Sequence, residues 1–88
     1  MTANKAYRIL AERDPLSKVR WCLDYGGFFV FCLAPIYIDD NKQYYCGTVM
    51  DAVDKKTGRV FQYDILSEPL AYERATEVKV DTIYNAKI

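Results

Sequence analysis

The first thirteen residues carry their apolar side chains at the spacing of a helix. Ala6, Ile9 and Leu10 recur three or four positions apart, with polar and charged residues between them. Pro15 ends the pattern, because the residue before a proline is kept out of the α region. We therefore predict a helix over Ala3–Arg13. A helix this short needs to bury its apolar face against another element to be stable.

From Val19 onward the period of the apolar pattern changes to two, which is typical of a half-buried strand. The glycine pair at 26–27 then favours a tight hairpin turn. The following run, residues 28–33, is apolar at every position, as in a central strand that is covered on both faces. Because Trp21 is in phase with Val19 and Leu23, we expect it on the face of the sheet that the helix covers.

A second hairpin is predicted from residues 44–53 and 59–66, which are both strand-like. The connection, Asp-Lys-Lys-Thr-Gly at residues 54–58, is typical of a type I turn that ends in a left-handed glycine. We expect a positive φ at Gly58. The carboxylate of Asp54 is placed to bond backbone N–H groups two residues further on.

The remaining residues predict a short helical turn at 70–75 and a last strand at 77–84, at an edge of the sheet. Together the elements predict an α+β fold in two layers. Its N-terminal helix is packed on a four- to five-stranded, mainly antiparallel sheet, with the helices on one face. The length of 88 residues predicts a single domain over residues 1–88.

This arrangement resembles that of the PepSY and YrhB-like modules, the latter including the immunity protein 35 type. The resemblance covers residues 5–65 and is carried by the leading helix, the aromatic hairpin at 21–31, and Val-Asp-Lys-Lys-Thr-Gly-Arg-Val at 53–60. Residues 36–43 and the segment after Ser67 depart from the family pattern. The resemblance implies a non-catalytic module that binds or inhibits another protein.

Composition excludes several classes of protein. The chain has no histidine, so it lacks the commonest general base and metal ligand. Twelve basic residues balance twelve acidic ones, which argues against a general polyanion binder. The longest apolar run, residues 28–38, is about half the roughly 20 residues of a transmembrane helix. No apolar secretory region occurs near the N-terminus, so we expect a cytoplasmic protein.

The three cysteines, Cys22, Cys32 and Cys46, form no Cys-x-x-Cys motif. Each lies in an apolar or aromatic run, where a free thiol behaves as a small hydrophobic side chain. We expect reduced thiols, as is usual in the cytosol. The alternative is a Cys22–Cys32 disulfide across the first hairpin, if the two Cα atoms lie within roughly 7 Å.

Two further groups of residues are candidates for chemistry. Paired carboxylates could hold a divalent cation, and the candidates are Asp39, Asp40, Asp51 and Asp64, but the spacing of an EF-hand loop is absent. We therefore expect solvated carboxylates, and neither a metal nor another cofactor. The aromatic run at 25–31 is similar in composition to the RNA-binding strand of the RRM fold, whose exposed aromatic side chains stack on bases. Its order of basic, aromatic and glycine residues differs from that strand. We therefore expect these aromatic residues to pack in the core and do not expect direct nucleic-acid binding.

Tyrosine occurs eight times, more often than a core this small can bury. Tyrosine is enriched in protein interfaces, although it also suits half-buried strands. We predict a partner-binding surface on the loop-like segment 36–45 and the neighbouring strand. Its residues are Tyr37, Asp39, Asp40, Tyr44, Tyr45 and Tyr63.

The sequence thus predicts a small non-catalytic protein-binding module. A stoichiometric inhibitor or an immunity or anti-defence protein of the phage or mobile-element type, such as an anti-CRISPR, fits best. We expect the partner to be another protein, one with a basic surface. A homodimer that forms through an edge strand is a further alternative. The alternatives are a small carboxylate- and metal-dependent enzyme and a homo-oligomeric structural protein.

Overall fold

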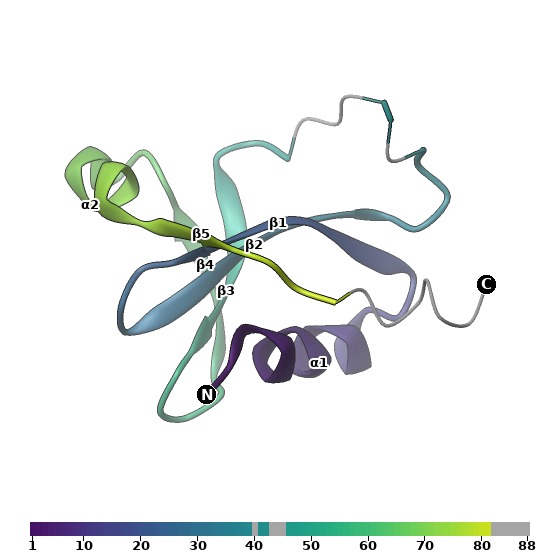
Figure 1. Ribbon diagram of the computed structural model, residues 1–88, viewed down its shortest axis with the longest axis horizontal. Coiled ribbons are helices and arrows are strands. Elements are labelled where there is room, and N and C mark those ends of the chain that lie inside the picture. The colour runs from purple at the N-terminus through teal and green to yellow at the C-terminus, as the bar shows by residue number, and fades with distance from the viewer. Residues whose placement is uncertain (40, 43–45, 82–88) are drawn as a thin grey trace.

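The computed structural model describes residues 1–39, 41–42 and 46–81 (Figure 1). The helix α1 (Ala3–Arg13) lies against one face of a five-stranded sheet, which confirms the predicted α+β fold in two layers. The strands are β1 (Ser17–Asp24), β2 (Phe28–Pro35), β3 (Val49–Asp54), β4 (Val60–Asp64) and β5 (Thr76–Val78). A second, short helix, α2 (Pro69–Arg74), precedes β5.

The strands lie in the order β4-β3-β2-β1-β5, and every neighbouring pair is antiparallel. The apolar strand β2 is therefore in the middle, as predicted. The last strand forms one edge, as predicted, and pairs with β1. It covers Thr76–Val78, whereas residues 82–84 of the predicted strand lie outside the described residues. The second hairpin is shorter than predicted, because β3 begins only at Val49.

Local signals fix both ends of α1. Thr2 precedes α1, and its hydroxyl accepts a hydrogen bond from the Lys5 amide at 3.2 Å, which satisfies one of the unpaired amides of the first turn. The helix ends at Arg13, two residues before Pro15.

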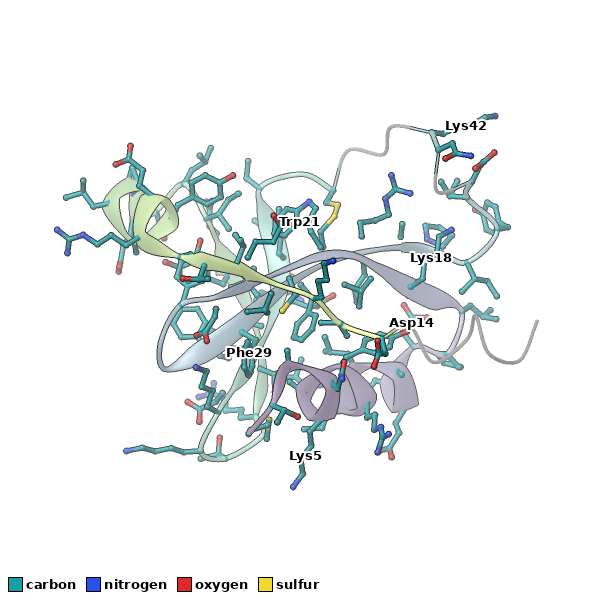
Figure 2. The ribbon with its side chains drawn as sticks, in the orientation of Figure 1. Lys5, Asp14, Lys18, Trp21, Phe29 and Lys42 are labelled. Atoms are coloured by element: carbon teal, nitrogen blue, oxygen red, sulfur yellow. A yellow bond between two sulfur atoms is a disulfide. The ribbon has the colours of Figure 1, made fainter. Side chains whose placement is uncertain are left out.

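The core between α1 and the sheet is closed. It contains Ala6, Tyr7 and Leu10 from the helix and Cys22, Phe29, Phe31 and Val53 from the sheet, all of them buried. The rings of Tyr7 and Phe31 are 6.5 Å apart, centre to centre. We call this side of the sheet the helix-covered face. Figure 2 shows Phe29 pointing from the sheet toward α1.

The opposite side of the sheet, which α1 does not cover, has a second apolar cluster. We call this side the helix-free face. Its buried floor consists of Val30, Cys32, Met50 and Ala52. Five half-buried aromatic residues pack against this floor, and we call them the aromatic surface: Trp21, Tyr25, Phe28, Phe61 and Tyr63.

The prediction that Trp21 faces α1 is wrong. Val19 pairs with Leu33 and Trp21 with Cys32, so β1 has one residue more than β2 between these two pairs. This β-bulge reverses the alternation of side chains. Val19 therefore packs on the helix-covered core, whereas Trp21 packs on the helix-free face (Figure 2).

The second hairpin turn confirms the predicted turn chemistry. Gly58 has a φ of 73°, and the Asp54 carboxylate accepts hydrogen bonds from the amides of Lys56 at 2.8 Å and Thr57 at 2.9 Å. These bonds lower the pKa of Asp54. The two turns lie side by side, because Phe28 of β2 pairs with Asp54 of β3. The Asp24 carboxylate, before the first turn, therefore forms an ion pair with the Lys55 ammonium of the second turn at 2.7 Å.

The cysteines differ from both predictions. Cys32 and Cys46 form a disulfide, with their Cα atoms 5.9 Å apart, so these two thiols are not reduced. Cys22 cannot bond Cys32, because it packs on the helix-covered core while Cys32 packs on the opposite face. Cys22 is a free, buried thiol, and burial, with a smaller contribution from Asp24, raises its pKa to about 12.

Candidate binding surface

The aromatic surface is built by strand alternation across three antiparallel pairs. Tyr63 pairs with Met50 and Phe61 with Ala52, and the partners in such a pair point to the same face. The small side chains of Val30 and Ala52 in the two central strands lie beneath the larger rings. Trp21 comes from β1, Phe28 from the start of β2, and Phe61 and Tyr63 from β4, and all of them pack against the buried side chains of β2 and β3.

The rings of this surface contact one another. Tyr25 and Phe28 stack at 5.1 Å, and Tyr63 lies 5.2 Å from Tyr25 and 5.0 Å from Phe28. Phe61 extends the group through an edge-on contact with Phe28 at 5.4 Å. Offset and edge-to-face pairs of this kind hold rings in defined positions. The surface is therefore ordered although it is only half-buried.

The helix α2 borders the aromatic surface without closing it. None of its side chains is buried, and Leu70 and Tyr72 are exposed by 66% and 45%. Tyr72 lies beside Trp21 and Leu23 on the helix-free face, so the expectation that both helices cover one face is wrong. The apolar side chains of α2 add to an uncovered surface.

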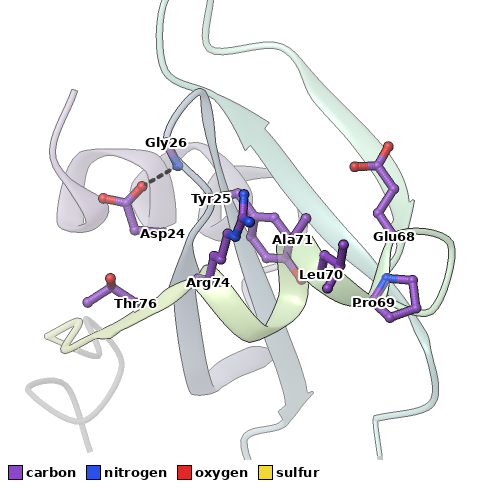
Figure 3. A pocket seen from close by; sticks show the side chains of 10 residues that line it. Asp24, Tyr25, Gly26, Glu68, Pro69, Leu70, Ala71, Arg74 and Thr76 are labelled. Carbon is purple, nitrogen blue, oxygen red and sulfur yellow. Dashed lines mark hydrogen bonds between the residues drawn. The ribbon is translucent and has the colours of Figure 1, made fainter.

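A cavity of about 780 Å³ separates α2 from the turn between β1 and β2 (Figure 3). Tyr25, Leu70 and Arg74 contribute to its wall. The Tyr25 hydroxyl is buried and has no hydrogen-bond partner in the described part of the chain. Burial, and then the neighbouring Tyr63 and Tyr72, raise its pKa to about 12, so it stays protonated at neutral pH as a donor.

The predicted partner-binding residues are distributed over different parts of the molecule. Tyr63 belongs to the aromatic surface, with Tyr25 and Phe28 as its ring contacts. Tyr37 is 83% exposed on the segment that follows β2. The exposed Asp39 on the same segment accepts a hydrogen bond from the Asn41 amide at 2.9 Å. The other three predicted residues, Asp40, Tyr44 and Tyr45, lie outside the described residues.

Two basic residues of β1 that the sequence analysis did not single out position this segment. The buried Lys18 ammonium donates to the Ile38 carbonyl. The Arg20 guanidinium donates to the carbonyls of Asp39 at 3.4 Å and Lys42 at 2.7 Å. Their signal in the sequence is two basic residues in a strand that carries few other charges, but their acceptors are backbone atoms that no residue pattern reveals.

The carboxylates proposed for metal binding make other contacts. Asp51 accepts a hydrogen bond from the Gln62 side chain at 2.6 Å, and Asp64 from the Leu66 amide at 2.9 Å. Over residues 1–39, 41–42 and 46–81, no three side chains of the kinds that bind metals come together. The described carboxylates therefore act on local turns and strand pairs.

Comparison with family models, with curated proteins and with solved structures gives no match to this chain. Within its described part, the chain has no helix of sufficient length and apolar character to cross a membrane.

Proposed function

We propose that this protein is a small non-catalytic module that binds another protein through the aromatic surface. The observation that supports this proposal is the asymmetry of the sheet. One face is closed by α1, whereas the other presents five half-buried aromatic side chains. Four of their rings, those of Tyr25, Phe28, Phe61 and Tyr63, contact one another. Tyrosine and tryptophan supply much of the binding energy at protein interfaces, and contiguous apolar patches on small domains mark interaction sites.

The segment that follows β2 and carries Tyr37, described at residues 36–39 and 41–42, extends the proposed interface beyond the sheet. We call it the Tyr37 segment. Tyr37 provides an exposed aromatic side chain, and the neighbouring Asp39 carboxylate would attract a partner with a basic surface. Lys18 donates a hydrogen bond to the Ile38 carbonyl, and Arg20 donates to the carbonyls of Asp39 and Lys42. Backbone that is fixed before binding loses less entropy in the complex.

Within this class, a stoichiometric inhibitor or an immunity or anti-defence protein of the phage or mobile-element type is the specific proposal. The zero net charge of the chain and the resemblance of residues 5–65 to the PepSY and YrhB-like modules support it. A cytoplasmic location is part of the same proposal. Disulfides are rare in the cytosol, so the redox state of Cys32 and Cys46 in intact native cells tests the location. Free thiols at both positions would support a cytoplasmic location, and a disulfide between them would contradict it.

The experiment identifies the partner by capture from an extract of the native host and then measures its affinity for purified variants. We expect Tyr63→Ala to weaken binding by about 1–3 kcal/mol, mainly through faster dissociation. Asp39→Lys should slow association in a salt-sensitive way. Leu16→Ala is the matched control, because Leu16 is 68% exposed but belongs to neither apolar cluster.

Affinity that is unchanged in Tyr63→Ala and also in Phe61→Ala, with both variants folded, would move the interface away from the aromatic surface. Two further measurements address the alternative functions. A rise in melting temperature on adding a divalent cation would favour the carboxylate enzyme. A dimer or larger assembly in light scattering would favour the homo-oligomer.

A further inference from the structure

A second cavity, of about 200 Å³, lies at the border between the aromatic surface and the sheet edge. Trp21, Leu23, Tyr72 and Glu77 line it. Three elements meet here: Trp21 and Leu23 come from β1, Tyr72 from α2 and Glu77 from β5. Figure 2 shows Trp21 on the side of the sheet away from α1.

The sheet register fixes the geometry of this cavity. Leu23 pairs with Glu77 across β1 and β5, so the Glu77 carboxylate is on the same face as Leu23 and Trp21. The bulge in β1 brings Trp21 to this face. Tyr72 lines the cavity from α2, a helix with no buried side chain, and is 45% exposed.

The cavity combines two aromatic rings with one carboxylate, a set of groups that favours a cation. Aromatic faces carry a negative quadrupole, which attracts ammonium and guanidinium groups. Glu77 is exposed, and no ion pair involves it in the part of the chain that the structure describes. Arg20 of β1 donates to the carbonyls of Asp39 and Lys42, and Arg74 lines the larger cavity near α2.

We propose that this cavity binds an arginine side chain of the partner protein, which rests on the proposed protein-binding function. Arginine fits better than lysine for two reasons. Its planar guanidinium stacks on a ring such as that of Trp21 while its N–H groups point outward in the same plane. Two of those N–H groups can then donate to the two oxygens of one carboxylate, here that of Glu77.

Trp21 is the one tryptophan of the chain, so its fluorescence reports on this cavity without a label. The probe is N-acetyl-arginine amide, and its uncharged analogue N-acetyl-citrulline amide has nearly the same shape. We expect the arginine probe to produce a saturable fluorescence change with a dissociation constant on the order of millimolar. The citrulline probe should produce no saturable change.

Glu77→Gln removes the charge and keeps the shape, so it should weaken binding of the arginine probe about tenfold or more. Glu73→Gln is the matched control, because Glu73 is an exposed residue of α2 that does not line the cavity. It should leave the affinity unchanged. Tyr72→Ala should weaken binding several-fold, and thermal melting of each variant confirms that it is folded.

Three results would overturn the arginine site: equal binding of both probes, full affinity in Glu77→Gln, or no saturable change with either probe. These measurements need no partner, so they are independent of the proposed function. A partner whose affinity depends on Phe61 but not on Glu77 would also overturn the arginine site and leave the protein-binding function standing. If the arginine probe binds but the partner is indifferent to Phe61 and Tyr63, the proposed function fails and the site remains.

Discussion

The two faces of the sheet use the same residue types for different purposes. On the helix-covered face, Phe29 and Phe31 are more than nine-tenths buried beneath α1. On the helix-free face, Phe28 and Phe61 keep part of their rings in solvent. A buried ring stabilises the fold by most of its transfer free energy, whereas a half-buried ring retains surface that a partner can cover. The rings of the helix-covered face therefore stabilise the fold, whereas those of the helix-free face keep surface that is available for contact.

The largest expected effect comes from the same substitution on each face. Phe31→Ala, at a ring that is 1% exposed, should lower the free energy of unfolding by about 3–5 kcal/mol, because it leaves a cavity that the core cannot fill. Phe61→Ala should cost about 1–2 kcal/mol, because part of that ring is in water in either state. Urea denaturation measures both. Equal losses would mean that the two faces are equally important for stability.

The disulfide provides the next largest effect, on the helix-free face alone. Cys32 and Cys46 are 14 residues apart, and closing a loop of this length in the unfolded chain stabilises the native state by about 3 kcal/mol. We expect a reductant to lower the melting temperature. The double variant Cys32→Ala, Cys46→Ala should match the reduced protein and be insensitive to the reductant.

Cys22→Ala is the control for this prediction, since it changes a thiol on the helix-covered face. The variant should still respond to the reductant by the full amount. A thiol reagent should label no cysteine of the oxidised native protein, because burial raises the pKa of Cys22 to about 12 and only a thiolate reacts readily. Labelling of three cysteines without a reductant would contradict the disulfide.

Beyond the fold class, the details that the sequence predicts correctly have local causes. The end of α1 depends on Pro15, and the positive φ of Gly58 depends on the five-residue turn that contains it. The face of Trp21 depends on a one-residue bulge, which follows from how β1 pairs with β2 and leaves no residue signature.

The candidate site is harder to predict, because its parts meet only in the folded chain. Tyr63 of the second hairpin is in both the predicted partner-binding set and the aromatic surface, but its neighbours Tyr25 and Phe28 belong to the first hairpin. The Leu23–Glu77 pair requires the last strand to return beside β1, a long-range pairing. Cysteine spacing likewise does not show on which face each thiol lies.

A smaller effect is expected where the second hairpin turn meets α1. A Cβ atom at Gly58 would lie 3.3 Å from Cδ1 of Ile9, and the φ of 73° disfavours any β-branched residue. We expect Gly58→Val to cost about 1–2 kcal/mol or more in urea denaturation. Gly27→Ala is the control, because Gly27 has open space around the Cβ position and no positive φ. If the two substitutions lower the free energy of unfolding equally, neither the backbone strain at Gly58 nor its contact with Ile9 of α1 contributes to the loss of stability.

The smallest effect is a charge interaction at the rim of the helix-covered face. The Asp24 carboxylate pairs with the Lys55 ammonium, which also lies 4.7 Å from the centre of the Phe29 ring. The side-chain contact with Lys55 and the hydrogen bond from the Gly26 amide lower the pKa of Asp24. A carboxylate whose pKa is lower in the folded state stabilises the protein above the unfolded pKa of about 3.9. That contribution is lost as the pH falls through the folded value.

Asp24→Asn should therefore be less stable than the wild type at pH 7, by up to about 1 kcal/mol, and equally stable at a pH below the folded pKa of Asp24. Asparagine keeps an acceptor for the Gly26 amide, so the difference isolates the charge. Urea denaturation at both pH values measures it. In a Lys55→Gln background, Asp24→Asn should lose most of this effect, as a double-mutant cycle requires of an interacting pair. A pH-independent difference would remove the ion pair from the factors that hold the helix-covered face together.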